Sequence, residues 1–214
     1  MKLKFPLSAA ATLLLSSVLS PASTLWNESA NGDLSSTQAT PSAATLLQGT
    51  NSVIGSVGVG DNRDWLTLTV PSGFQLSSIT LFSYNSTDAQ GFTGMQSGSV
   101  FTGSFNSPAS YLGYAHFGTG ATNPSTPTNL VGQDILPIMK DPSAAQGAQG
   151  FTTLGSGSYA FLIQQTGNAV TSYQFDYNVT AVPEPSLTGL LGLGGLALLR
   201  GRRRALTLTP GRGL

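Results

Sequence analysis

The segment AVTSYQFDYNV (169–179) has the clearest strand pattern in the chain and sets the fold class. Large or β-branched side chains alternate there with Ser, Gln, Asp and Asn, which is typical of a β-strand with one buried face. The alternating residues are Thr171, Tyr173, Phe175, Tyr177 and Val179. The turn residues TGN (166–168) separate this segment from SYAFLIQ (158–164), so we predict that the two strands form an antiparallel hairpin.

Other segments upstream have the same kind of pattern. RDWLTLTV (63–70) alternates throughout, and in FQLSSITLFSY (74–84) a shift of the apolar phase between Leu76 and Ile79 predicts a β-bulge. Shorter strands are predicted at 44–48, 52–59, 99–103 and 111–117. Residues 129–139 have weak helical spacing, which Pro137 limits. Many short strands joined by turns rich in Gly and Pro indicate an all-β fold, an antiparallel β-sandwich.

The N-terminus has the layout of a secretory signal. Lys2 and Lys4 precede an apolar stretch over residues 9–19, and the small residues Ser20 and Ala22 are spaced for cleavage after Ala22. A buried N-terminal helix is the alternative, but it does not explain this order of features. We therefore predict that residues 1–22 are a signal peptide removed by signal peptidase, and that the protein is exported.

The region between the two ends of the chain is acidic and has no cysteine. Residues 23–182 contain eight acidic side chains and two basic ones, Arg63 and Lys140, which gives a net charge of −6. Such a surface offers no basic patch for nucleic acid. Without cysteine the fold has no disulfides, so it must be stable through packing alone or through packing and a metal.

The C-terminus combines a proline turn, an apolar run and a basic cluster. VPEPS (182–186) precedes thirteen mostly apolar residues, 187–199. The basic cluster follows as Arg200, Arg202, Arg203 and Arg204. As a helix the apolar run would be about 20 Å long, short of the roughly 30 Å hydrocarbon core. Because arginines favour the cytoplasmic side, the pattern indicates a transient membrane anchor with the domain outside.

These residues resemble the PEP-CTERM sorting signal of Gram-negative bacteria. The resemblance implies that an exosortase, an integral-membrane protease, recognises Pro183, Glu184 and Pro185 and removes the tail. It also implies a place at the cell surface or in an extracellular polysaccharide and biofilm matrix. The extension 205–214 departs from the pattern, since such tails usually end soon after the basic cluster. An ordinary C-terminal helix of the domain is the alternative. The predicted segments are thus 1–22, 23–181, 182–204 and 205–214.

The few acidic residues of the central region are grouped in two places. Glu28 and Asp33 lie in WNESANGDLSS, and Asp61 and Asp64 lie in GVGDNRDWLTLTV. Carboxylates at this spacing can converge on a hard cation, with Asn31 or backbone carbonyls completing the coordination. Asp in Asn-Gly-Asp and Gly-Asp-Asn is also a common turn former, which is the alternative.

Residues 26–84 also resemble the bacterial pre-peptidase C-terminal domain. That resemblance implies a jelly-roll-like sandwich, with calcium held at Glu28, Asn31, Asp33, Asp61 and Asp64.

No arrangement of residues points to an enzyme. His116 is the only histidine, no Gly-x-Ser-x-Gly motif occurs, and nothing marks a carboxylate pair for glycoside hydrolysis. We therefore predict a non-enzymatic surface or extracellular-matrix protein. The alternatives are a secreted carbohydrate-binding module and a polysaccharide-active hydrolase with an unrecognised site. The aromatic residues that could stack on a sugar are Trp26, Trp65, Tyr84, Tyr111, Tyr114, Tyr159, Tyr173 and Tyr177.

Overall fold

A computed structural model describes residues 22–88, 90–118, 120, 129–139, 151–165 and 167–183. The strands are β1 (Ser23–Asn27), β2 (Ser42–Thr45), β3 (Gly49–Val57), β4 (Arg63–Val70), β5 (Phe74–Asn85), β6 (Gly91–Ser97), β7 (Gly113–Phe117), β8 (Gly157–Gln164) and β9 (Thr171–Ala181). One helical turn, α1 (Glu28–Asn31), follows β1, and a 3-10 turn, η1 (Pro108–Ser110), precedes β7.

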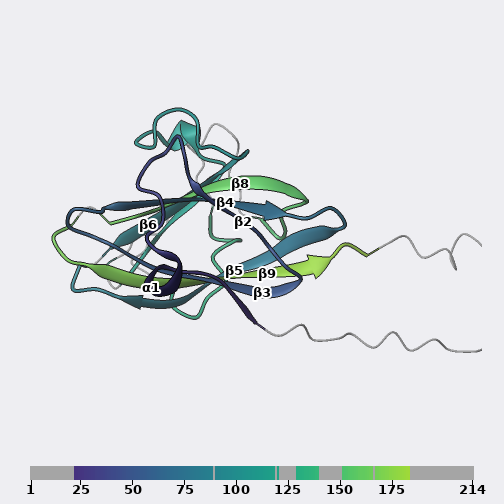
Figure 1. The fold of residues 1–214 in the computed structure, drawn as a ribbon, viewed down its shortest axis with the longest axis horizontal. Coiled ribbons are helices and arrows are strands. Elements are labelled where there is room, and N and C mark those ends of the chain that lie inside the picture. Colours follow the sequence, from purple (N-terminus) through teal and green to yellow (C-terminus); the bar gives the residue numbers. More distant parts are fainter. Residues whose placement is uncertain are drawn as a thin grey trace, which may run out of the picture. The chain divides into compact units, whose positions relative to one another are not determined.

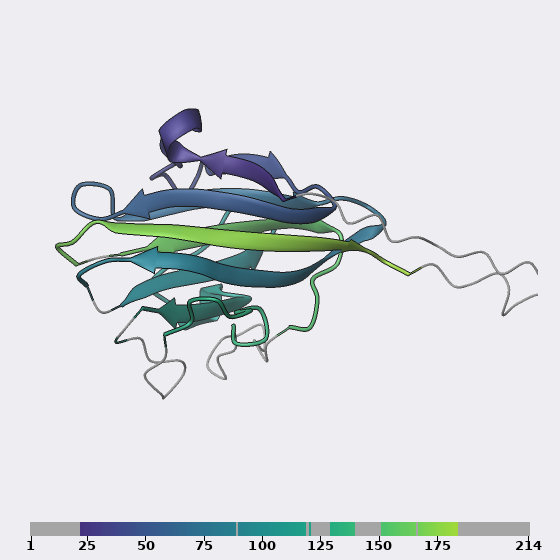
Figure 2. The same ribbon diagram turned by 90° about the horizontal axis from the view of Figure 1, so that it is seen from below.

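The strands form two sheets that face each other (Figure 1). The four-stranded sheet has the order β1-β3-β9-β5, which Figure 2 shows side by side, and the five-stranded sheet has the order β2-β4-β8-β6-β7. From β1 to β6 each strand lies in the opposite sheet to the one before it. The all-β, two-layered prediction is confirmed, but both sheets are mixed, because β1 pairs parallel with β3 and β2 pairs parallel with β4.

The predicted hairpin between residues 158–164 and 169–179 is wrong. β8 pairs with β4 and β6 in one sheet, whereas β9 pairs with β3 and β5 in the other. The short connection therefore crosses from one sheet to the other. Alternation identifies a strand and its buried face, but a short turn can join two sheets as readily as two neighbouring strands.

Other predicted elements agree with the structure to different degrees. β4 has the predicted bounds, and β5 contains the predicted bulge, with a shift of register between Leu76 and Ser78. The predicted strand 99–103 lies instead in the loop before η1, and β6 was missed because its sequence, GFTGMQS, has little alternation. Residues 129–139 form turns rather than a helix.

The core lies between the sheets, where the inward faces of the strands meet. The Phe161 ring on β8 packs edge-on against Tyr177 on β9, and Phe117 on β7 packs in the same way against Phe175, each pair 5.5 Å apart between ring centroids. A second, smaller cluster lies on the outer face of the five-stranded sheet under the loop before β7. It contains Trp65, Phe101, Tyr111, Ala160 and Leu162.

The two predicted targeting segments fall largely outside the described residues. The chain divides into two units, 1–181 and 182–214, and all the strands belong to the first. Residues 1–21 and 184–214 are not described, so the predicted signal peptide and sorting helix lie there, with Glu184, Pro185 and the four arginines. Within the described residues, no helix has the length and apolar character needed to cross a bilayer.

Candidate metal centre

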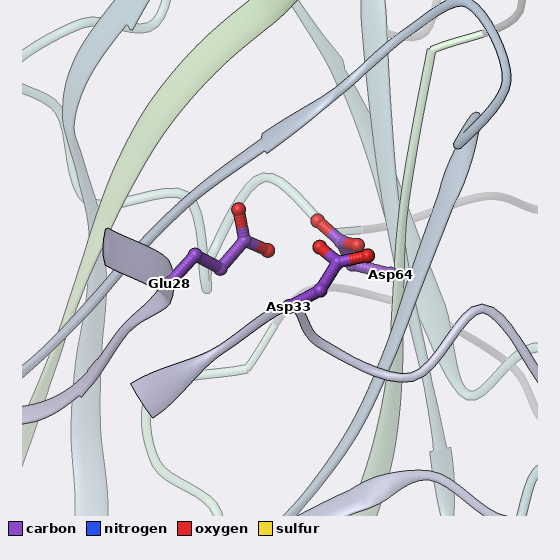
Figure 3. Close-up of side chains that lie close together, drawn as sticks. All are labelled: Glu28, Asp33 and Asp64. Atoms are coloured by element: carbon purple, nitrogen blue, oxygen red, sulfur yellow. The ribbon is translucent and has the colours of Figure 1, made fainter. Parts of the chain in front are cut away.

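Three of the predicted carboxylates meet at one point. Glu28 begins α1, Asp33 follows that helix, and Asp64 lies on β4. One carboxylate oxygen from each lies within 4.8 Å of those of the other two, and Figure 3 shows the three groups pointing toward one another. Oxygens that bind Ca²⁺ at 2.3–2.6 Å from the ion lie at most about 5 Å apart. The spacing is therefore that of ligands around a single cation.

A tight turn brings Glu28 and Asp33 to the same place. The Asn27 side chain caps α1 by accepting a hydrogen bond from the Ser29 amide, and the Gly32 amide donates to the Glu28 carbonyl at 3.0 Å. Gly32 has a φ of 84°, a conformation that glycine adopts without strain. It reverses the chain, so that Asp33 returns toward the helix.

The Glu28 carboxylate is fixed by backbone groups on either side. Its Oε2 accepts a hydrogen bond from the Ser56 amide on β3 at 2.8 Å, and its Oε1 accepts from the Leu34 amide at 3.4 Å. A Cβ atom at Gly55 would lie 2.8 Å from Glu28 Oε1 and 2.5 Å from the Tyr173 hydroxyl. Gly55 therefore leaves the space that the Glu28 and Tyr173 side chains occupy.

Asp64 is the deepest of these carboxylates, and its hydrogen bonding is incomplete. The residue is 0 % exposed. Its Oδ2 accepts a hydrogen bond from the Tyr173 hydroxyl, but its buried Oδ1 has no partner. Burial raises the pKa of Asp64 to about 8, the Tyr173 hydrogen bond opposes this shift, and the charges of Glu28, Asp61 and Asp33 add to it. An ionised carboxylate in this position would be costly unless a cation bound it.

Asp61 joins the group from the turn between β3 and β4. Gly58 and Asp61 exchange backbone hydrogen bonds of 2.7 and 3.0 Å across this turn. Burial and the neighbouring Asp33 carboxylate raise the pKa of Asp61, and its buried Oδ1 has no hydrogen-bond partner. We call Glu28, Asp33, Asp61 and Asp64 the acidic cluster.

The fifth predicted ligand, Asn31, already has a role within α1. Its Oδ1 accepts a hydrogen bond from the Asn27 amide at 2.9 Å and so helps to close the helical turn. To bind an ion in the acidic cluster, Asn31 Oδ1 would have to give up its hydrogen bond with the Asn27 amide. The structure thus brings Glu28, Asp33 and Asp64 together, places Asp61 beside Asp33, and uses Asn31 locally.

The one Lys or Arg side chain of the described residues points away from the acidic cluster. Arg63 directly precedes Asp64 on β4, and successive side chains of a strand point to opposite faces. The Arg63 guanidinium lies over the Phe105 ring, 4.3 Å from its centroid, and Nε has no hydrogen-bond partner. Within the described residues, the acidic cluster therefore has no Lys or Arg side chain directed toward it.

The structure also locates the residues of the two predicted alternatives, an enzyme and a carbohydrate-binding module. His116 is half-buried on β7, with its ring against Phe92 and Tyr114, and burial lowers its pKa. Four aromatic residues that could have stacked on a sugar are at most 2 % exposed and pack inside the protein; they are Trp65, Tyr111, Tyr173 and Tyr177. Tyr173 instead supports the acidic cluster, a role that no local sequence signal indicates, since 109 positions separate it from Asp64.

No family model, no curated protein and no solved structure matches the chain.

Proposed function

We propose that this chain is an exported, non-enzymatic surface or extracellular-matrix protein whose sandwich domain is stabilised by a bound Ca²⁺ ion. The observation that carries the proposal is the buried Asp64 oxygen, which has no partner although two other carboxylate oxygens lie within 4.8 Å of that carboxylate. Glu28, Asp33, Asp61 and Asp64 would hold the ion. The positive charge of the ion would compensate the negative charges of these carboxylates, which the described side chains do not compensate.

The ligand chemistry favours calcium over other common metals. The acidic cluster offers only oxygen atoms, which Ca²⁺ and Mg²⁺ prefer, whereas Zn²⁺ favours sulfur and imidazole nitrogen. The chain has no cysteine, and its single histidine packs against Phe92 and Tyr114 rather than in the cluster. Ca²⁺ accepts the irregular geometry that a helix, a turn and a strand provide, while Mg²⁺ requires a nearly ideal octahedron.

The order of the strands supports the jelly-roll part of the prediction. The order β3-β9-β5 in one sheet faces β4-β8-β6-β7 in the other, and the chain crosses between sheets from β3 through β6. A jelly roll is a double-sheet structure of this kind, built from two Greek keys. In this proposal the sandwich is a domain of the pre-peptidase C-terminal type, with β1 and β2 added as parallel edge strands.

The C-terminal motif supports a role at the cell surface. β9 ends at Ala181, so the recognition residues Pro183, Glu184 and Pro185 directly follow the last strand in the sequence. Cleavage there would leave every described strand intact. In this proposal signal peptidase removes residues 1–22, an exosortase-type protease removes the tail, and the domain remains in the cell envelope or the extracellular polysaccharide matrix.

Thermal unfolding of the purified full-length chain tests the calcium proposal. Extracellular calcium modules bind with Kd values of about 10⁻⁴–10⁻³ M. At a concentration about 100 times Kd, the ion adds about 2.7 kcal/mol to the free energy of unfolding, which raises Tm by about 5–10 °C for a domain of this size. The comparison is 10 mM Ca²⁺ against a chelator at pH 8, with 10 mM Mg²⁺ as the control ion.

A pair of variants tests whether the increase in Tm with Ca²⁺ comes from the acidic cluster. Asp64→Asn should abolish the increase in Tm while keeping the shape of the side chain. Asp176→Asn is the matched control, because Asp176 also accepts side-chain hydrogen bonds, from Ser52 and Gln174, but lies on β9 outside the cluster. Equal Tm values for the unmodified chain in Ca²⁺ and in chelator would rule out a structural calcium site.

The sorting part of the proposal has an independent test. Mass spectrometry of the protein recovered from its native cells should find an N-terminus at Ser23 and no residues beyond about Pro185. A mature protein that still carries the arginines at 200–204 would exclude processing of the tail, whatever the result with calcium.

A further inference from the structure

A row of side chains crosses the outer face of the five-stranded sheet at one end. The strand register pairs Arg63 with Gln164, Gln164 with Phe92, and Phe92 with His116, so this row runs over β4, β8, β6 and β7. Phe92, His116 and Gln164 are all partly exposed. This face points away from the core and from the inward side of β4 that carries Asp64.

Phe92, His116 and Gln164 of this row form the floor of a pocket. The cavity has a volume of about 550 Å³, within the range of about 300–1,000 Å³ that is usual for small-ligand sites. Phe105 and Asn106, from the loop before β7, form one wall, and the loops that precede β6 and follow β8 form the other. We call Phe92, Phe105, Asn106, His116 and Gln164 the aromatic pocket.

The apolar part of the aromatic pocket is a group of closely packed rings. The Phe92 ring centroid lies 5.2 Å from that of His116, 5.6 Å from that of Tyr114 and 5.4 Å from that of Tyr111. Phe105 lines the same cavity and packs on Trp65, with 5.9 Å between the ring centroids. These contacts hold Phe92 in the floor and Phe105 in the wall as apolar surfaces of the cavity.

The polar part is mostly uncharged. Asn106 and Gln164 bring two side-chain amides, each of which can both donate and accept hydrogen bonds. The His116 ring is the third polar group. Asp88, at the rim, has one carboxylate oxygen occupied by the Ala169 amide at 3.0 Å. A ligand for this pocket therefore needs an apolar face and several neutral donors and acceptors, but no charge.

The loop that carries Phe105 and Asn106 is held in place without a ligand. Gln96 on β6 donates to the Thr102 and Ser110 carbonyls at 3.2 and 2.8 Å, and the Tyr111 hydroxyl donates to the Phe105 carbonyl at 2.6 Å. A wall that is ordered in advance loses less conformational entropy when a ligand binds. The loop therefore already has its bonded conformation before a ligand contacts Phe105 and Asn106.

We propose that the aromatic pocket binds one neutral pyranose unit of an extracellular oligosaccharide. The C–H face of the sugar ring would lie against Phe92, with Phe105 on its other side. Its hydroxyl groups would exchange hydrogen bonds with the Asn106 and Gln164 amides and with His116. The physiological role rests on the export proposed above, but the binding itself is a property of the folded domain and does not depend on the tail or on calcium.

A glycan array and isothermal titration test this inference. The probes are immobilised and soluble neutral oligosaccharides of glucose, galactose, mannose and N-acetylglucosamine, applied to the full-length chain in a detergent without a sugar headgroup. We expect binding to at least one series, and Phe92→Ala should lower that affinity at least about tenfold through loss of the stacking surface. Phe82→Ala is the matched control, since Phe82 is a 57 % exposed ring on β5, in the other sheet.

Two additional measurements keep the test valid if Phe92→Ala folds poorly. Asn106 is exposed on a loop, so Asn106→Ala should keep the fold and still weaken binding several-fold. In NMR spectra of the unmodified protein, the sugar should shift the His116 ring and Gln164 amide signals. Absence of binding across all four series would overturn the inference, as would binding that is unchanged in both variants. Neither result would affect the calcium or processing tests, which use different readouts.

Discussion

The acidic cluster and the packing that supports Phe105 of the aromatic pocket use neighbouring residues of one strand that point in opposite directions. On β4, Asp64 points inward to Tyr173 and the other carboxylates, whereas Trp65 points outward to the aromatic rings of Phe101 and Phe105. The two-residue period of a strand thus separates a group of carboxylates from a group of aromatic rings within a single step of the chain.

The two regions differ in how completely their polar groups are satisfied. In the acidic cluster, Asp61 and Asp64 each have a buried oxygen with no partner. Beside the aromatic pocket, Gln96 uses both its amide nitrogen and its oxygen on the backbone of the overlying loop. We infer that the first region depends on an ion for its stability, whereas the loop of the second is held by its own hydrogen bonds, although the buried Arg63 Nε beside Phe105 also has no partner. Calcium and pH should therefore affect one region, and substitutions of aromatic residues the other.

The largest effect is expected from Trp65→Ala, which tests whether the two regions are independent. Trp65 is 1 % exposed, and its loss leaves a large cavity under the Phe105 loop. Such substitutions lower the free energy of unfolding by about 3–5 kcal/mol. Urea unfolding measures this loss. The variant should bind sugar poorly, because Phe105 loses its support, yet its Tm should still rise with calcium by the same amount.

Loss of the calcium response in Trp65→Ala would show that the two faces of β4 are coupled and would contradict the comparison. Leu68→Ala provides the control, because Leu68 is also 1 % exposed on β4 but belongs to the main core rather than to the cluster beneath the Phe105 loop. It should destabilise the domain without a selective effect on sugar binding.

A smaller effect, seen with pH, should belong to the acidic cluster alone. In the folded state the pKa of Asp64 is about 8, above its ordinary value of 3.8, so the folded protein keeps a proton that the unfolded chain releases. Stability from this group is present below about pH 4 and is lost as pH rises through 8. In chelator, we expect the free energy of unfolding to fall by at most about 1.4 kcal/mol per pH unit between pH 7 and 8.

Added Ca²⁺ and the Asp64→Asn variant distinguish this fall in the free energy of unfolding from the titration of other groups. Burial raises the pKa of Glu28 and Asp61 as well, so they act in the same direction, whereas the pKa of His116 is lowered from 6.5 and this ring is neutral above pH 7. With saturating Ca²⁺ the decline with pH should disappear, and Asp64→Asn should lack most of it in chelator. A chelated protein whose stability rises from pH 7 to 8 would contradict the assignment.

The sequence predicted the strands better than their partners. Alternation located most of β4, β5, β8 and β9, because a strand with one buried face repeats every two residues. It could not show that β8 and β9 lie in different sheets, since pairing depends on contacts between distant segments. β6 was missed because two glycines interrupt its pattern, and the Cβ of a larger residue at Gly94 would lie 2.3 Å from the Tyr111 ring.

The two candidate sites were predictable to different degrees for the same reason. Glu28 with Asp33, and Asp61 with Asp64, are close in sequence, so local spacing was enough to suggest a cation site. The aromatic pocket depends on strand register, which places Gln164, Phe92 and His116 in one row although up to 72 positions separate them. None of these three was among the aromatic residues that the sequence suggested for sugar stacking.

The smallest effect is expected from Arg63→Lys, which changes a residue that lies between Asp61 and Asp64 in sequence but contacts Phe105 of the aromatic pocket. The Arg63 guanidinium covers the Phe105 ring at 4.3 Å. Lysine keeps the charge but loses the planar stacking surface. We expect the free energy of unfolding to fall by about 0.5–1 kcal/mol, and sugar affinity to fall slightly because Phe105 is held less firmly. Urea unfolding and isothermal titration measure the two changes.

Arg63→Met extends this test to the acidic cluster, because it removes the charge and keeps an unbranched side chain. If Arg63 belongs to the outer face alone, both variants should show the same increase in Tm with calcium as the unmodified chain. If Arg63 instead neutralised Asp61 and Asp64 in solution, removing its charge would leave those carboxylates more dependent on the ion. The increase in Tm would then be larger in Arg63→Met than in Arg63→Lys, and the separation of charge by the two faces of β4 would be refuted.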